Sequence, residues 1–504
     1  MIFCKRTSSI SIFRLILLIL VISITETISA QNNRIQHPSI EPSFTLDQVL
    51  VATSKEKYSS DEIFKLTLLF SECPLESETG IRCLEKFESI KTDVTADLFM
   101  ELDVQERGRR ILKYLYQNYL TKYNLDQTRI DVALETGVYN CVSSAMLYLA
   151  AAKAAGLDVR GQKTTQHAFC SVYIPSTTQG QLIKIDVETT NPYGFNPGTK
   201  ETIENEENIK KYYVVPKKYY SNRLEVSDGV FAGLIAGNIC TDCIKQGDYN
   251  HGVPLAAARY DVVRNENSKA ISDVRQEFDV LAANYVNINP GNASLYYEVV
   301  EWFTNFIDRW GITPFLQKNM DNAFINLQVL CGKEKNYPLS LKSFNQFETY
   351  VTPQQLLKSE EIKADILFST NTENASPDLK IDIINKLLSL EDYQSGAFQK
   401  RGALYLEQAW LEILNEYMNK KEYQTGIKKA DEALTQLPQN PKIKNMRQYF
   451  YSNSIAIIHN NFAKEANSKK YDKALQIVQE GLELFPNDKT LKKDLSDLQK
   501  LLNQ

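Results

Sequence analysis

Three residues in one short stretch of the chain have the types that nucleophilic catalysis needs. Cys141, His167 and Asp186 follow one another between Tyr139 and Thr190. A free thiol with a pKa of about 8.5 is only a few per cent thiolate near neutral pH, so a nucleophilic cysteine needs a base beside it. His167 could take the proton, and Asp186 could hold the imidazole tautomer and stabilise its charged form. These types predict acyl transfer through a thioester.

The residues after the cysteine predict a helix that would activate the thiol. The run "CVSSAMLYLAAAKAAGLDV" is rich in small residues and is ended by Gly156. Cys141 would sit at or just before the N-terminus of this helix, where the helix dipole favours the thiolate. Asn140 and the first backbone N–H groups could donate hydrogen bonds to an oxyanion. Gln166 could contact a substrate, although polarity at a strand edge explains it equally well.

Two strand-like runs after this helix predict an antiparallel hairpin. "TTQHAFCSVYI" and "QLIKIDVETT" are separated by the turn-like "PSTTQG". A centred turn pairs residues whose numbers sum to 353, which places His167 directly opposite Asp186. Glu188 and Thr189 either shape the site or form a solvated strand end. The opposite face of the hairpin would carry seven apolar core residues: Ala168, Cys170, Val172, Ile174, Ile183, Ile185 and Val187.

The order and context of these residues resemble the transglutaminase-like superfamily, a circularly rearranged relative of papain-type cysteine proteases. The resemblance rests on "YNCVSSA", "HAF" and "IDVETT", and covers roughly residues 85–225. It implies that Cys141 is the nucleophile, His167 the base and Asp186 the orienting acid. Members often carry a tryptophan near the nucleophile for the oxyanion, whereas here Val142 follows the cysteine and no tryptophan lies nearby.

The rest of the chain is helical in pattern. Residues 44–120 carry apolar residues at intervals of three and four, and the strand signal nearly disappears after residue 226. Three segments, 228–263, 404–440 and 453–490, each have a helix, a polar turn ending in tyrosine, and a second helix. A small residue follows each tyrosine by three positions, which resembles tetratricopeptide repeats. Repeats could not be phased in 264–398.

These patterns predict an α+β fold with several domains. We expect a signal peptide at 1–30, a disordered linker at 31–43, a helical lead-in plus transglutaminase-like domain at 44–225, and a helical region at 226–504. A chain of 504 residues is too long for one hydrophobic core. The net charge of −5 is spread over the chain, so no basic face predicts binding to nucleic acid.

The N-terminus predicts export. Lys5, Arg6 and Arg14 precede the apolar run from Leu15 to Ile24, and small residues at Ser29 and Ala30 suit cleavage. The run is shorter than the roughly 20 residues that a spanning helix needs. We therefore expect a periplasmic or extracellular protein with no stable membrane span after cleavage. An uncleaved N-terminal anchor is the alternative.

Export changes how the cysteines are interpreted, because disulfides persist outside the cytoplasm. Cys73 and Cys83 flank a short polar loop, so we expect a disulfide between them; two buried thiols are the alternative. Cys240 and Cys243 have redox or metal spacing, but packing between helices explains them better. No metal or cofactor is expected.

The expected function is a cysteine-dependent peptidase, amidase or acyl transferase that acts on a protein or peptide. The helical region would bind an unidentified protein partner or the substrate. The alternative is a catalytically inactive scaffold of the same fold. The simplest structural explanation of Cys141, His167 and Asp186 is a buried cysteine and a His–Asp pair that stabilise the fold without catalysis.

Overall fold

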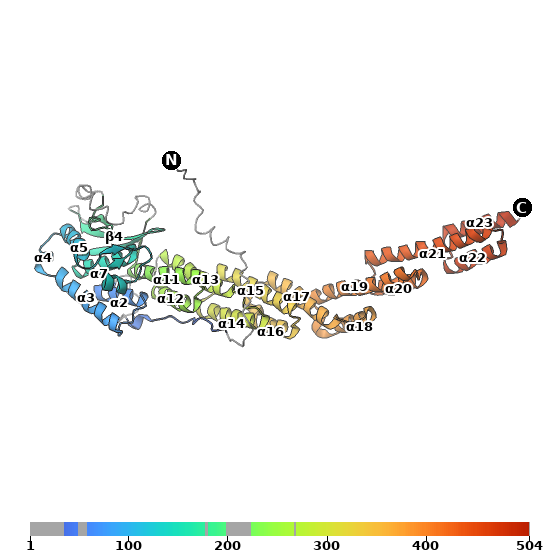
Figure 1. Cartoon of the computed structure of the whole chain (residues 1–504), viewed down its shortest axis with the longest axis horizontal. Helices are drawn as coiled ribbons and strands as arrows, with labels where there is room; N and C mark the ends of the chain where they lie inside the picture. The colour runs from blue at the N-terminus through green and yellow to red at the C-terminus, as the bar shows by residue number, and fades with distance from the viewer. Residues whose placement is uncertain (1–34, 49–57, 177–179, 198–222, 267–268, 503–504) are drawn as a thin grey trace, which may run out of the picture. The chain divides into compact units, whose positions relative to one another are not determined.

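The computed structural model describes residues 35–48, 58–176, 180–197, 223–266 and 269–502. It confirms an α+β fold, in which a region with a small antiparallel sheet precedes a mostly helical part (Figure 1). The predicted signal peptide and its cleavage site lie outside the described residues. No helix among those described is both long and apolar enough to cross a bilayer. The elements before the sheet are η1 (Leu46–Gln48), α2 (Ser60–Phe70), α3 (Glu78–Val94), α4 (Asp97–Met100), α5 (Val104–Asn118), β1 (Lys122–Tyr123), α6 (Ile130–Thr136), β2 (Val138–Tyr139) and α7 (Cys141–Ala154).

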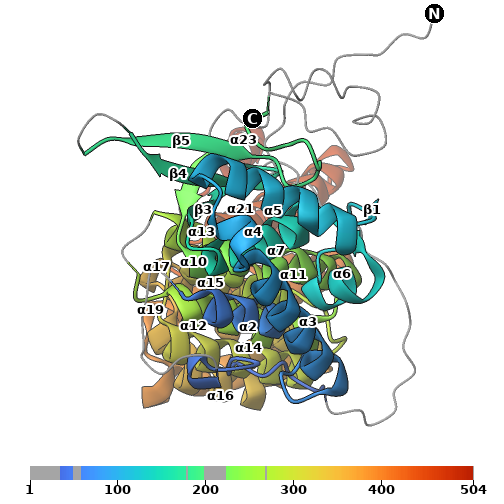
Figure 2. The same cartoon turned by 90° about the vertical axis from the view of Figure 1, so that its left-hand side faces the viewer.

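The sheet has the strand order β5-β4-β3-β6, and every neighbouring pair is antiparallel. Its strands are β3 (Asp158–Lys163), β4 (Ala168–Pro175), β5 (Leu182–Val187) and β6 (Leu224–Val226). Helix α7 packs against β3 and β4, and α5 also contacts β4 (Figure 2). The predicted hairpin is therefore present as β4 and β5.

The predicted register of this hairpin is wrong. Asp186 pairs with Ser171 rather than with His167, because β4 runs on to Pro175 and pairs there with Leu182. The turn is thus displaced by two residues along the chain. A displacement by an even number keeps each side chain on its face, since side chains alternate along a strand.

The apolar face of the hairpin is core along only part of its length. Cys170, Val172, Ile185 and Val187 are buried as expected. Ile183, near the free end of the hairpin, is 52% exposed, so the prediction of seven core residues is too long at that end.

Helix α7 is the central element of the sheet-containing region, and its sequence explains its place. It is buried nearly all round, which matches its unbroken run of small and apolar residues. Tyr148, for example, is fully buried and donates a hydrogen bond to the carbonyl of Gly108. Preceding helix α6 ends at Gly137, whose left-handed φ of 74° turns the chain sharply toward the start of α7.

The helical part begins directly after β6 and consists of consecutive packed helices. Its elements are α10 (Asp228–Ala232), α11 (Leu234–Gln246), α12 (Tyr249–Val263), α13 (Ala270–Val286), α14 (Ala293–Trp310), α15 (Pro314–Lys333), α16 (Tyr337–Phe347), η3 (Glu348–Tyr350), α17 (Pro353–Thr372), α18 (Pro377–Leu388), η4 (Glu391–Tyr393), α19 (Gly396–Lys420), α20 (Tyr423–Gln436), α21 (Pro441–Asn467), α22 (Tyr471–Leu484) and α23 (Lys489–Leu502).

The three helix pairs expected from the tyrosine pattern are present as α11–α12, α19–α20 and α21–α22. The structure adds a fourth, α15–α16, in the segment that could not be phased. Each second helix starts at a tyrosine, and the residue two positions earlier has positive φ; these pairs are Gly247 and Tyr249, Lys335 and Tyr337, Lys421 and Tyr423, and Lys469 and Tyr471. The fourth copy was missed because Ser340, rather than glycine or alanine, is its small buried residue.

Close packing at these small residues gives a stability prediction. A Cβ at Gly426 would lie 2.8 Å from three atoms of the Phe450 ring, so Gly426→Ala overpacks the contact between α20 and α21. Overpacking costs about 1–3 kcal/mol, and the better helix propensity of alanine offsets roughly 1 kcal/mol. We expect a lower midpoint of urea unfolding for Gly426→Ala. Gly396→Ala is the control, because its Cβ would meet nothing within 4 Å; equal midpoints would contradict the prediction.

The two parts share a buried ionic junction. Lys153 near the end of α7 lies 2.6 Å from Asp228 at the start of α10, and both side chains are largely buried. The same aspartate accepts the backbone N–H of Tyr58, whose carbonyl accepts from Lys153. Three segments distant in sequence therefore meet at one carboxylate and one ammonium group.

The expected disordered linker at 31–43 is wrong for its second half. Residues 37–44, which we call the N-terminal strap, lie against α13 and α14. The indole N–H of Trp302 donates to the carbonyl of Pro38 at 2.7 Å, and that of Trp310 donates to the carbonyl of Ile40 at 2.9 Å. A polar composition did not predict order here because backbone carbonyls, which every sequence has, make these contacts.

The strap also contacts α12 in the helical part and α2, which lies before the sheet. The N–H of Ser43 donates to the carbonyl of Pro254 in α12, and the ring of Phe44 packs edge-on against Phe70 in α2. It thus adds a second connection between α2 and the helical part, beside the ionic junction.

Cys73 and Cys83 are free buried thiols in the structure, so the expected disulfide is not formed there. Each packs as a small apolar side chain, and Cys73 Sγ lies 3.9 Å from Ser77 Oγ. Burial, together with the charge of Cys73, raises the pKa of Cys83 to about 12. Cys73 is thus close enough to raise the pKa of Cys83, but the two thiols are unbonded.

Candidate functional site

Cys141 is the first residue of α7. The side chain of Asn140 caps the helix by accepting the N–H groups of Val142 and Ser143, and Ser143 Oγ accepts the N–H of Asn140 in return. The cysteine is 8% exposed. The capping box and the unbroken small-residue helix therefore place the thiol at the positive end of the helix dipole, as the sequence predicts.

His167 directly precedes β4 and joins two of the candidate residues. Its Nε2 lies 2.8 Å from Oε2 of Glu188. On the other side, the Cys141 thiol is close enough to help raise the pKa of the imidazole. The imidazole is thus placed between a thiol and a carboxylate.

The environment of His167 favours its charged form. Burial alone lowers the pKa of an imidazole, but the hydrogen bonds and charges of Cys141 and Glu188 outweigh it and raise the pKa of His167 to about 9. A charged imidazole beside a thiol stabilises the thiolate. The arrangement therefore favours a protonated imidazole beside Cys141 and Glu188.

The acid beside His167 is Glu188, and the assignment of Asp186 to this position is wrong. Asp186 accepts a hydrogen bond from Ser171 Oγ at 2.9 Å and pairs with Arg223. The error follows from the register: the numbers of paired residues sum to 357 rather than 353, which moves the partner of Asp186 from His167 to Ser171. Glu188 directly follows β5 and reaches the histidine from the loop after the strand.

A compact loop at residues 188–196 carries Glu188. The N–H of Glu188 donates to the carbonyl of Gly194, and a Cβ at Gly194 would lie 1.9 Å from the carbonyl oxygen of Glu188. Only glycine allows this approach. Next to it, the ring of Phe195 fills the space above Gly108 of α5, where a Cβ would lie 2.6 Å away. The loop is thus fixed to itself and to α5.

Asn140 caps α7 in this arrangement, and its role as an oxyanion donor stays a prediction. Its Oδ1 caps the helix and its Nδ2 donates to the carbonyl of Leu125 at 3.1 Å. Within the described part of the chain, the remaining donor of the first turn of α7 is the N–H of Cys141 itself. That N–H is the candidate oxyanion donor.

Gln166 is exposed beside His167. Its backbone N–H donates to Thr164 Oγ1, and the structure gives its side chain no hydrogen bond within the described residues. Its contact with a substrate stays a prediction.

Burial determines the electrostatics of the other described cysteines. Burial raises the pKa of Cys240 and Cys331 to about 12 and that of Cys243 to about 11, and it raises the pKa of Cys73 and, strongly, of Cys170. Cys240 Sγ donates to the carbonyl of Gly252 and Cys243 packs against the same glycine, as expected for cysteines between helices. Among the residues that the structure describes, no group of three ligands is arranged for a metal ion.

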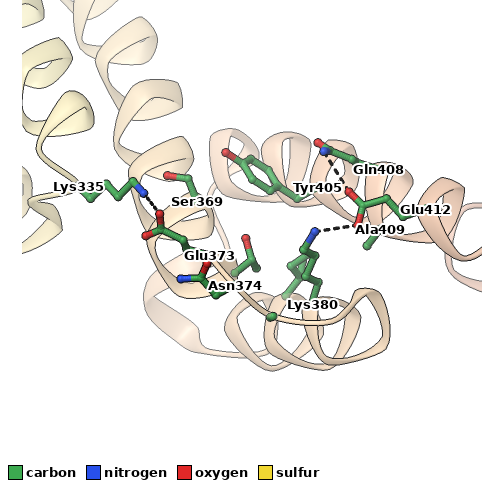
Figure 3. A pocket seen from close by; sticks show the side chains of 12 residues that line it. Lys335, Ser369, Glu373, Asn374, Lys380, Tyr405, Gln408, Ala409 and Glu412 are labelled. Carbon is green, nitrogen blue, oxygen red and sulfur yellow. Dashed lines mark hydrogen bonds and ion pairs between the residues drawn. The ribbon is translucent and has the colours of Figure 1, made fainter.

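A hollow lies in the helical part, between α17, α18 and α19 (Figure 3). Its volume is about 410 Å³. Lys380 pairs with Glu412 at 2.8 Å on one side, and Lys335 pairs with Glu373 on another. The hollow is therefore polar, with both signs of charge balanced around it.

Comparison with known proteins adds no relative. No family model, no curated protein and no solved structure matches this chain.

Proposed function

We propose that this protein is a cysteine-dependent enzyme that cleaves or transfers acyl groups of amide bonds. The observation that supports it is the placement of His167 between Cys141 and Glu188, with the pKa of the imidazole raised to about 9. Perturbed titratable groups that face one another are typical of catalytic sites. The sequence around them resembles the transglutaminase-like superfamily in its order of cysteine at a helix start, then histidine, then acid.

Each residue has one role in the proposed reaction. The Cys141 thiolate attacks the amide carbonyl carbon and forms a tetrahedral oxyanion, which the N–H of Cys141 stabilises. His167 gives its proton to the leaving amine, and the C–N bond breaks to leave a thioester. Water or a second amine then gives a proton to His167 and attacks the thioester carbonyl; the C–S bond breaks and releases the Cys141 thiolate. Glu188 holds the imidazole in place and stabilises its charge throughout.

Thiol labelling tests the proposal without a known substrate. We expect iodoacetamide to modify Cys141 of the folded protein rapidly at pH 7, ahead of Cys83, Cys240 and Cys331, whose pKa values are about 12. Mass spectrometry of tryptic peptides identifies the labelled cysteine. Slow labelling of Cys141 that rises only near pH 8.5 would reject an activated nucleophile.

The raised pKa of His167 also predicts a pH dependence of stability. The folded value, about 9, lies above the ordinary value of about 6.5, so the folded state binds the proton more tightly. This contribution is fully present below pH 6.5 and is lost as the pH rises through 9. We expect the urea midpoint of the wild-type protein to fall more between pH 6 and pH 9.5 than that of His167→Gln. Parallel losses in both proteins would contradict it.

A catalytically inactive scaffold is the second candidate, and the polar hollow between α17 and α19 favours it. Charged groups of both signs around a cavity of this size could bind a polar segment of a protein partner. Cys141→Ala separates the two candidates in cells that depend on the protein. A scaffold keeps its function after this substitution, whereas an enzyme loses it at unchanged protein level.

A further inference from the structure

The carboxylate of Glu188 has a second set of contacts, which point away from the histidine. Its Oε1 accepts the N–H of Thr190 at 3.1 Å and the Thr190 hydroxyl at 2.7 Å, while Oε2 faces His167. One residue therefore supplies two donors to one carboxylate oxygen.

These donors matter because Glu188 is buried. The residue is 4% exposed, and Thr190 is fully buried. A buried carboxylate is costly unless hydrogen bonds replace its lost water. The two donors supply part of this replacement, and they also fix the plane of the carboxylate, so that Oε2 points at the imidazole.

The backbone around Thr190 is itself held. The N–H of Glu188 is bound to the carbonyl of Gly194, and the N–H of Gly194 is bound to that of Asn191. The preceding hydroxyl, on Thr189, lies 3.2 Å from Ser144 Oγ of α7, and the Thr189 carbonyl accepts the hydroxyl of Tyr116. These hydrogen bonds hold the backbone of the loop, and so they fix the place from which the Thr190 hydroxyl meets Glu188.

We infer that Thr190 is a positioning residue for the candidate site, which acts on His167 through Glu188. The inference rests on the proposed function for its consequence in catalysis. The effect of Thr190 on the pKa of His167 can be measured without any substrate.

Thr190→Val removes the hydroxyl and keeps the shape of the side chain. Thr189→Val is a matched control, because it removes an equally buried hydroxyl from the same loop, but one that contacts Ser144. Thr190→Ser restores the hydroxyl. The readout is the titration of the His167 ring by NMR, in a chain with only four histidines.

Without the Thr190 hydroxyl the Glu188 carboxylate is free to turn, which weakens the contact of Oε2 with the imidazole. We therefore expect Thr190→Val to lower the measured pKa of His167 by about 0.5 to 1 unit, the scale of one weakened charge-assisted hydrogen bond. The labelling rate of Cys141 at pH 7 should fall by about three- to tenfold with it. Thr190→Ser and Thr189→Val should both titrate like the wild-type protein. A wild-type titration in Thr190→Val, or an equal shift in Thr189→Val, would overturn the inference.

The experiment separates this inference from the proposed function. Slow labelling of Cys141 in the wild-type protein rejects the proposed function, whereas the comparison of titrations still decides the role of Thr190. Thr190→Ala, which also lacks the hydroxyl but is smaller, replaces Thr190→Val if the valine does not fold, with the same criterion.

Discussion

Glu188→Gln should slow the labelling of Cys141 at pH 7 by at least about tenfold, and turnover of a substrate by as much as about 10⁴-fold, as in other triads whose acid is made an amide. The glutamine amide can donate a hydrogen bond to Nε2 of His167, which places the remaining imidazole proton on Nδ1. A neutral amide also no longer favours the charged ring, so the Cys141 thiolate loses the imidazolium that would stabilise it. The substitution also removes the charge that stabilises the imidazolium.

Asp186→Asn is the matched control for this experiment. It makes the same chemical change two residues earlier on the same face, but its carboxylate contacts Ser171 and Arg223. We expect Cys141 labelling close to the wild-type rate, measured under the same pseudo-first-order conditions. A large loss in Asp186→Asn with little loss in Glu188→Gln would return the acid role to Asp186 and contradict the geometry described here.

Asp228→Ala should destabilise the folded protein by about 3–5 kcal/mol, because it leaves the ammonium group of Lys153 buried without a counter-charge. The N–H of Tyr58 loses its acceptor as well. The measurement is the urea midpoint, followed by circular dichroism. A reduced slope of the transition would indicate that the two parts no longer unfold together.

Two further variants test whether the unpaired charge of Lys153 causes the loss of stability in Asp228→Ala. Glu416→Ala breaks an exposed pair with Lys420, four residues along the same helix, and should leave the urea midpoint almost unchanged, because water screens exposed ion pairs. Replacing Lys153 by methionine together with Asp228 by leucine removes both charges, and it should recover much of the stability. A small effect of Asp228→Ala alone would mean that water reaches Lys153 after the substitution.

The sequence predicts the site best where local rules determine the structure. Asn140 as cap and the small residues after Cys141 specify the helix start, and alternation specifies which face of β5 carries the acid. Register is not a local property, because it depends on how far β4 extends before the chain reverses. The same alternation of apolar residues fits two registers of the hairpin. The sequence alone therefore could not decide whether Asp186 or Glu188 lies beside His167.

Two further features of the fold could not be predicted from the sequence, for different reasons. The strap is held by indole N–H groups from residues more than 260 positions away, and no pattern within residues 37–44 indicates that contact. The tyrosine pattern does not predict the α15–α16 pair for a local reason. Three positions after its tyrosine the residue is Ser340, where the other helix pairs have glycine or alanine. The left-handed turn two residues before the tyrosine is a backbone feature, and Lys335, Lys421 and Lys469 adopt it without a glycine that would reveal it.

The strap also makes the protein optically informative about its own N-terminus. The chain has three tryptophans, and two of them, Trp302 and Trp310, donate their indole N–H groups to strap carbonyls. Indole emission depends on the polarity and hydrogen bonding around the ring. Intrinsic fluorescence therefore follows the docking of residues 37–44 in real time with no added dye, and Trp410 in α19, which bonds to Gln436 instead, provides the background signal.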